Sequence, residues 1–504
     1  MPWILAVVFL AGYSIAFAWL SPLSLQDYPN HLARAQVIAD LIFHHGARFG
    51  GAFHYHFVAI PYLLGDLLLA GASELFGIQH AAALWSVFVF LSLPCALLFY
   101  LRTTALANDG KTLLLILSAY LSTDWFFLVG FLEFRLGVAA SLFALGLSEQ
   151  VRRRPSVAVL TAYVTVLTLG YLTHLTTLVF VTAALGTSAA LRLYRGATRL
   201  RTELALLIPC CVLVLWHFSS EEAYRQPGDL VENGYVWGTL LSKFARVASE
   251  FWRYRTPTDA MMACALALSV ALYGGRVTRR DLKNPAALEL LALAGTMIGL
   301  YFILPMGYTE AYYVDVRALP LAYLFVILAL LTLSARTRHR RGRPVLAVCV
   351  AVLLVAANLA YLVRHLAVQS TWLRQYRAVI AAIPPGAQVL PIYTRGPEGN
   401  VVPFLHAHSF IMIDRGGVVP YLQTGDTGNP QKYIRYVNRA YAPLQTWYGD
   451  SPAPLVDWQA VACEYDFILV TKPFEPRRLK APVRLIVENS SAALLALAPQ
   501  SPCR

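Results

Sequence analysis

Long apolar stretches alternate with short polar segments along the chain as far as residue 364. A helix needs about 20 mostly apolar residues to cross the hydrocarbon core of a bilayer, and the stretches predict about eleven such helices. They are 3–20, 79–102, 112–130, 135–150, 157–173, 175–192, 203–218, 257–275, 286–304, 319–334 and 345–364. The first lacks a basic start and a small-residue cleavage site, so we interpret it as an uncleaved span.

The stretch 57–77 is apolar but contains Pro61, Asp66 and Glu74. A carboxylate at mid-membrane depth costs about 2.5–3.5 kcal/mol, so we expect this stretch to lie at the interface. The arginine-rich loops then share one side, which the positive-inside rule makes cytoplasmic, together with the N-terminus. The segments expected to face outward are 21–78, 131–134, 219–256, 305–318 and 365–504.

The hydropathy changes after Arg364, which predicts a domain boundary between 1–364 and 365–504. Trp372–Ile383 has the pattern of an amphipathic helix, ended by Pro384-Pro385-Gly386. Four apolar runs separated by Gly, Pro, Asn and Asp predict strands: Ala387–Tyr393, Phe467–Val470, Val483–Val487 and Ala492–Leu497. The C-terminal part is therefore expected to be a small periplasmic α/β domain.

The chain is 58% hydrophobic and 14% charged, whereas soluble domains carry about a quarter charged residues. Its net charge of +13 comes from basic clusters between apolar stretches, so we exclude nucleic acid as a partner. The Ala-, Leu- and Arg-rich composition indicates a multi-pass protein of the bacterial inner membrane. In the outer domain, Cys463 and Cys503 are expected either to pair or to be free thiols.

The first outer loop has a carboxylate, an imidazole and a guanidinium at the start of a predicted helix. Asp27, His31 and Arg34 are one turn apart and share a face, and Pro29 suits the first helical turn. Asp27 is expected to cap this helix, to act as a general base or metal ligand at the membrane surface, or to do both.

Two further carboxylates and an arginine lie where a helix pair turns at the outer surface. They are Asp124, Glu133 and Arg135, with Glu133 and Arg135 close enough in sequence for a local ion pair. That pair, with aromatic anchors around it, is the structural alternative to a functional site, which charges at membrane depth otherwise indicate.

Two outer helix junctions add candidates. His174 stands between two spans, at the depth expected for Asp27 and Glu133. Glu310, Asp315 and Arg317 precede the span 319–334, and the planar fork of an arginine suits phosphate. The outer loop Glu221–Arg255 is basic against the positive-inside trend, which would suit an anionic lipid head group; its cations are Arg225, Lys243, Arg246, Arg253 and Arg255.

The order of these motifs resembles the GT-C class of polytopic membrane glycosyltransferases, which use polyprenyl-phosphate-linked sugars. The resemblance covers most of the membrane part and the outer domain. The residues that carry it are Asp27-Tyr28-Pro29-Asn30-His31 with Arg34, Gly130–Gly137, Thr173-His174-Leu175 and Arg317-Ala318-Leu319-Pro320.

The resemblance implies a GT-C-like fold and transfer, with inversion, from a polyprenyl-phosphate sugar to a glycan, lipid or protein acceptor. It makes Asp27 the catalytic base and His31 or Arg34 its partner. It also leaves a place for a divalent metal ion, Mg²⁺ or Mn²⁺, with Asp27 as its ligand. No other cofactor is expected.

The remaining roles follow from the same resemblance. Glu133 or Asp124 assists the base, and Arg317 with Arg135 holds the donor phosphate. The residues expected to bind substrate are Arg34, Asp124, Arg135, His174, Glu310, Asp315 and Arg317.

Two other functions stay open. A transporter or flippase would place ionisable residues near the bilayer midplane and show inverted repeats, but here the charges concentrate at one surface. A non-catalytic scaffold for envelope assembly would keep working after Asp27→Asn, whereas the enzyme would not.

Overall fold

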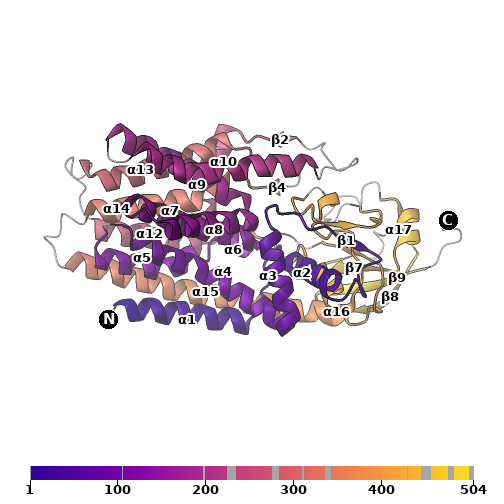
Figure 1. Ribbon diagram of the computed structural model, residues 1–504. Coiled ribbons are helices and arrows are strands. Elements are labelled where there is room, and N and C mark those ends of the chain that lie inside the picture. Colours follow the sequence, from indigo (N-terminus) through magenta and orange to yellow (C-terminus); the bar gives the residue numbers. More distant parts are fainter. Residues whose placement is uncertain are drawn as a thin grey trace.

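The apolar stretches fold into long helices that lie side by side, and the C-terminal part of the chain covers one end of them (Figure 1). The computed structural model describes all residues except 1, 105, 197–198, 224–233, 275–282, 309–310, 335–341, 395, 397, 428, 444–455, 475–478, 480–481 and 499–504. The bundle helices are α1 (Pro2–Trp19), α4 (Ile78–Leu101), α5 (Asn108–Leu121), α6 (Trp125–Val129), α7 (Leu132–Arg153), α8 (Val157–Thr173), α9 (Leu175–Tyr194), α10 (Leu200–Ala223), α12 (Pro257–Gly274), α13 (Pro285–Ile303), α14 (Leu319–Ser334) and the first part of α15 (Gly342–Ile380).

The bundle has the composition of a membrane domain. Among the described residues, eight segments are long and apolar enough to cross a bilayer: Ile78–Leu101, Asn108–Val129, Leu175–Tyr194, Leu200–Ser220, Pro257–Gly274, Pro285–Ile303, Val316–Leu333 and Arg343–Ile380. The helices α1 and α8 are apolar but shorter, and α7 is longer but more polar. Large apolar side chains such as Ile15, Leu215 and Leu353 are about 70% exposed on the outside of the bundle, where lipid solvates them. Each predicted span falls on one of these helices, except that α5 and α6 divide the span 112–130. The protein is a multi-pass membrane protein.

Helices α2 (Tyr28–Phe43) and α3 (Leu63–Phe76) fill the loop between the first two bundle helices. At 14 residues, α3 is shorter than a membrane span, and it runs across the ends of the bundle helices rather than along them (Figure 1). The carboxylate of Asp66 on α3 is fully buried and receives the guanidinium of Arg34 from α2. Asp66, whose charge disfavours a membrane-spanning helix, therefore joins α3 to α2 through this ion pair.

The C-terminal region contains a four-stranded mixed sheet in the order β5-β7-β9-β8. Its strands are β5 (Val389–Ile392), β7 (Phe467–Thr471), β8 (Val483–Glu488) and β9 (Ala492–Leu497); β5 runs parallel to β7, and the other neighbours are antiparallel. The short helix α17 (Trp458–Glu464) packs against the sheet, whereas α16 (Phe410–Arg415) packs against α2 and α15. Cys463 on α17 is in a disulfide, and Cys503 lies outside the described residues.

The separate helix predicted at Trp372–Ile383 is instead the end of α15, which is 39 residues long and passes residue 364 without a break. The sequence 345–383 contains neither proline nor glycine, so nothing stops the helix before Pro384-Pro385. One rigid element therefore carries the chain from the bundle to the sheet.

Three contacts fasten the first outer loop to the C-terminal region. Strand β1 (Phe53–Tyr55) pairs with β6 (Ile434–Tyr436), and the hydroxyl of Tyr433 donates to Asp66. The amide of Asn30 accepts from the N–H of Gln423 at 3.0 Å. The two parts of the chain are therefore joined at this end of the bundle.

The remaining described elements are short. They are the strands β2 (Tyr235–Val236), β3 (Gly307–Tyr308) and β4 (Ala311–Tyr312), which form a three-stranded sheet, the helix α11 (Leu240–Arg246), and the 3-10 turns η1 (Ser249–Phe251), η3 (Val316–Ala318), η4 (Ala407–Ser409) and η5 (Gly425–Thr427).

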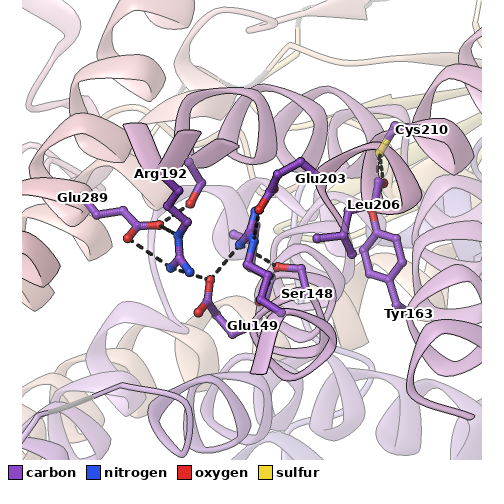
Figure 2. A network of polar contacts seen from close by, with 11 residues as sticks. Ser148, Glu149, Tyr163, Arg192, Glu203, Leu206, Cys210 and Glu289 are labelled. Carbon is purple, nitrogen blue, oxygen red and sulfur yellow. Dashed lines mark hydrogen bonds and ion pairs between the residues drawn. The ribbon is translucent and has the colours of Figure 1, made fainter. Parts of the chain in front are cut away.

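An ion-pair network joins four helices at the other end of the bundle (Figure 2). Glu149 on α7 accepts from Arg152 at 2.7 Å and from Arg192 of α9 at 2.8 Å. Arg152 also pairs with Glu203 of α10, and Arg192 pairs with Glu289 of α13. Every cation of the network has a carboxylate partner, as buried charges require.

Candidate active site

A cavity of about 570 Å³ lies where the bundle meets the C-terminal region. The bundle and the first outer loop supply one wall, which includes Asp27, His31, Tyr62, Glu133, His174 and Arg317. The C-terminal region supplies the other wall, which includes His406, Tyr421, Gln423, Asn429, Gln431 and Arg439. We call the wall from the bundle and the first outer loop the inner wall, and the wall from the C-terminal region the outer wall. The inner wall carries acidic and basic side chains, whereas the outer wall is polar and largely neutral.

Asp27 occupies the N-cap position of α2 without acting as a cap. Its side chain accepts no capping hydrogen bond from the described start of the helix, and its carboxylate lines the cavity. The backbone N–H of Asp27 donates to the carbonyl of Val129 at 2.9 Å, which ties the loop to the turn before α7. Oδ1 of Asp27 lies 3.5 Å from Nε2 of His406. The carboxylate is free for chemistry because the fold does not use it as a cap.

His31 and Glu133 meet on the inner wall. Nδ1 of His31 lies 2.8 Å from Oε1 of Glu133 and 2.9 Å from Nη2 of Arg34. Arg34 itself is fully buried behind His31 and makes a two-pronged contact with Asp66. Glu133 therefore pairs across helices with His31, and not with its neighbour Arg135.

A divalent metal does not fit these groups. Ligand atoms of His31, Asp66 and Glu133 lie within 4.8 Å of one another, as a metal site requires. The guanidinium of Arg34 stands among them, 2.9 Å from Asp66 and His31 and 3.9 Å from Glu133. The cluster already contains its cation, and a second, divalent one would meet electrostatic repulsion.

Arg317 and His174 form the opposite corner of the cavity. Nη1 of Arg317 lies 3.2 Å from Nε2 of His174, which also lies 2.9 Å from the hydroxyl of Tyr62. The guanidinium lies over the rings of Phe131 and Phe134, at 5.2 and 5.9 Å from their centroids. Among the described residues it has no carboxylate partner, and its Nε makes no hydrogen bond. This cation is therefore available to an anion that enters the cavity.

Tyr62 also lines the cavity, although it was not a candidate from the sequence. Its backbone conformation is unusual. It has a φ of 75°, in the left-handed region that few side chains adopt, and its N–H donates to the carbonyl of Thr173 at 3.2 Å. Such strain persists only where surrounding contacts enforce it, and it is concentrated at functional sites.

Four of the remaining candidates lie behind the cavity wall. Asp124 caps α6 and pairs with Arg135 at 2.6 Å, and Arg34 is engaged by Asp66. Asp315 is buried against Arg246 at 2.6 Å. Glu310 lies outside the described residues. The structure thus gathers Asp27, His31, Glu133, His174 and Arg317 at one cavity. It gives structural partners to Arg34, Asp124, Arg135 and Asp315.

None of the residues of the outer wall was a candidate from the sequence. Its residues come from irregular segments between residues 405 and 443, which have no periodic pattern. Burial lowers the pKa of His406, and the Asp27 carboxylate opposes only part of that effect. His406 is therefore neutral near pH 7.

The chain matches no described family of sequences, and no curated protein matches it by sequence. By structure it is similar to ArnT from Cupriavidus metallidurans bound to undecaprenyl phosphate, at 12% identity, a TM-score of 0.53, and coverage of 98% of this chain and 99% of that chain. It is also similar to the arabinofuranosyltransferase AftD from Mycobacteria, at 13% identity and a TM-score of 0.51, over 98% of this chain and 40% of that chain. Identity at this level shows the fold alone. The chain has the GT-C fold that its motifs predicted.

Proposed function

We propose that this protein is a membrane glycosyltransferase that moves a sugar from a polyprenyl-phosphate-linked donor to a hydroxyl group of a glycan, lipid or protein. One observation carries the proposal. A single cavity contains a carboxylate that the fold does not use, Asp27, and a cation without a carboxylate partner among the described residues, Arg317. Transfer from a phosphate-linked sugar needs both a base and a cation.

The chemistry assigns each group a role. Asp27 removes the proton of the acceptor hydroxyl as its oxygen bonds to the anomeric carbon. The bond between that carbon and the phosphate oxygen breaks, and the polyprenyl phosphate leaves with the electron pair. Arg317, steadied by Phe131 and Phe134, stabilises the charge on the leaving phosphate. Attack from the side opposite the phosphate inverts the anomeric carbon.

The supporting groups hold this arrangement. His174 contacts both Arg317 and Tyr62, which orients the guanidinium. His31 and Glu133 lie 2.8 Å apart beside Asp27 and limit the positions that the sugar can take. The outer wall offers amides, among them Gln423 and Gln431, that suit sugar hydroxyls.

The position of the cavity suits a lipid-linked donor. It lies where the bundle ends, so a polyprenyl tail can remain in the bilayer while the phosphate and sugar reach Arg317 and Asp27. The structural neighbour ArnT was crystallised with undecaprenyl phosphate, which makes this lipid the first donor carrier to test. With the arginine-rich loops in the cytoplasm, the cavity faces the periplasm of a bacterial inner membrane.

The test is a transfer assay in proteoliposomes with a panel of undecaprenyl-phosphate monosaccharides, read by mass spectrometry of the lipids. We expect the wild type to consume one donor and release undecaprenyl phosphate. Asp27→Asn should lower that rate at least about a hundredfold, because the base is lost. Asp414→Asn is the matched control, since Asp414 pairs with Arg377 away from the cavity.

Two results would contradict the proposal. Consumption of no donor by the wild type, with lipid moved unchanged between leaflets, would indicate a transporter. Full activity of Asp27→Asn in complementation of an envelope defect would indicate a scaffold.

A further inference from the structure

We propose that His406, supplied by the C-terminal region, is a positioning residue for Asp27, so that the catalytic site is divided between the bundle and the C-terminal region. The inference rests on the proposed function and extends it. It gives the C-terminal region a part in the chemistry beyond covering the cavity.

The geometry brings the two side chains together from positions 379 residues apart in the sequence, since 406 minus 27 is 379. Nε2 of His406 lies 3.5 Å from Oδ1 of Asp27. Both side chains are 12% exposed, and both line the cavity. A donor at this distance closes to hydrogen-bond length through a small rotation, and catalytic contacts tighten when substrate is bound.

The fold fixes the histidine ring. His406 directly precedes η4, which packs against α2, the helix that Asp27 begins. The ring meets His408 edge-on at 5.6 Å between centroids, and the carbonyl of His406 accepts from the N–H of Ser409 at 3.0 Å. The imidazole therefore has a defined direction relative to the carboxylate.

The hydrogen-bonding pattern selects the tautomer. Nδ1 of His406 is buried and has no hydrogen-bond partner among the described residues. A buried N–H without an acceptor is costly, whereas Nε2 faces a carboxylate that accepts. The neutral ring therefore carries its hydrogen on Nε2 and donates it to Asp27.

This donation has two effects on the reaction. It holds one carboxylate oxygen, which leaves the other to take the proton of the acceptor hydroxyl. It also stabilises the ionised carboxylate, which is the form that acts as a base. His406 keeps its own proton throughout, so the transfer needs no further reactant.

Other charged and titratable groups also face Asp27, and they matter for any pH profile. From the elements around the cavity they are His31, Tyr62, Glu133, His174, Tyr312, Tyr313, Arg317, Tyr421 and Arg439. All of them stay in place in the variants proposed here, so a change in the profile reports the loss of the imidazole.

The test compares His406→Ala and His406→Gln with the wild type, using the undecaprenyl-phosphate sugar that the wild type consumes. We expect His406→Ala to lower kcat about tenfold to a hundredfold, with a smaller effect on KM. The acid limb of its pH–rate profile should move to higher pH, because a carboxylate that loses a donor is protonated more readily. The amide nitrogen of glutamine can take the place of Nε2, so His406→Gln should regain most of the rate.

A second comparison separates positioning from a structural role. In the Asp27→Asn background, His406→Ala should add little further loss, because the base that the histidine positions is already gone. His54→Gln is the control histidine; it lies on β1, and its ring is partly exposed. Melting temperatures of all variants identify any that fail to fold.

The outcomes distinguish the two proposals. If Asp27→Asn is inactive while His406→Ala keeps the wild-type kcat and pH profile, the inference is wrong and the proposed function stands. Equal losses in the wild-type and Asp27→Asn backgrounds would also overturn it. If the wild type consumes no donor, both fall together.

Discussion

At the scale of single residues, Gly130 sets how closely the first outer loop approaches the bundle. It has a φ of +85°, and a Cβ there would lie 2.9 Å from the backbone nitrogens of Asp27 and Tyr28. The hydrogen bond from Asp27 to Val129 depends on this approach. The backbone that places the proposed base therefore tolerates no side chain at position 130.

Gly130→Ala should displace Asp27 and lower kcat by about tenfold to a hundredfold, because small misplacements of catalytic groups are costly. The strained φ should also lower the free energy of unfolding by about 1–2 kcal/mol. Gly186→Ala in α9 is the control, since a Cβ there meets nothing within 4 Å. Wild-type kinetics in Gly130→Ala would show that the turn does not position the base.

Arg317→Gln should weaken binding of undecaprenyl phosphate about tenfold or more, because charge-assisted hydrogen bonds to phosphate are lost. Arg317→Lys should be intermediate, since an ammonium keeps the charge but not the planar fork. Binding of the labelled lipid to protein in nanodiscs measures both. Arg377→Gln, on the surface ion pair with Asp414, is the control, and equal affinity in all variants would exclude Arg317 as the phosphate site.

The sequence predicted the inner wall better than the outer one, for a physical reason. Asp27, Glu133 and Arg317 stand at the ends of apolar stretches, where a charge is conspicuous against its surroundings. His406 and Gln431 stand in polar, irregular segments where such residues are ordinary. Sequence also could not tell Arg135 from Arg317, because only the fold shows that the first has a carboxylate partner.

At the scale of elements, α7 links the two ends of the bundle. Its first turn carries Glu133 into the cavity, and its last turns carry Glu149 and Arg152 into the network of Figure 2. The network joins α7 to α9, α10 and α13 through Arg192, Glu203 and Glu289. The start of α7 thus contributes to the proposed catalytic site, and its end holds the bundle helices together through ion pairs.

Glu149→Gln should lower the free energy of unfolding by about 1–3 kcal/mol, because it leaves two arginines with one carboxylate fewer. The donor KM should stay unchanged, since the network is at the far end of the bundle from the cavity. Thermal unfolding in detergent and the transfer assay measure the two effects. Glu488→Gln, from the exposed pair with Lys472, is the control; a KM change in Glu149→Gln alone would contradict the separation of the ends.

Element boundaries followed from the sequence wherever one rule dominated. Lipid requires long apolar helices, so the spans were predictable from hydropathy. At Trp372–Ile383 two signals competed, because the change to amphipathic character indicated a new element while the absence of proline and glycine favoured continuation. The helix continues through both parts, and α15 is therefore a single helix.

At the scale of the whole molecule, the C-terminal region closes the cavity through contacts that include neutral, buried histidines. Burial lowers the pKa of both His406 and His408 in the folded state. In the unfolded chain these groups titrate near 6.5, so below that pH the unfolded state binds more protons. Stability is therefore present above about pH 6.5 and falls as the pH drops below it.

The melting temperature should accordingly fall between pH 7.5 and pH 5.5, before most carboxylates titrate. A variant with both His406→Gln and His408→Gln should show a smaller fall across the same interval, whatever its absolute stability. Differential scanning fluorimetry in detergent at several pH values measures the slopes. An unchanged slope in the double variant would mean that other groups cause the dependence.

The length of α15 has a mechanical consequence. Its 39 residues extend for about 58 Å, roughly twice the thickness of a hydrocarbon core, without a proline or glycine between residues 345 and 383. A transmembrane helix tilts in a thinner bilayer, and a continuous helix transmits that tilt to the C-terminal region that follows it. The outer wall follows this helix in the chain, and strand β1, Asn30 and Asp66 fasten the first outer loop to that wall. Acyl chain length should therefore shift the outer wall relative to Arg317 in the bundle, which would make the catalytic rate depend on bilayer thickness.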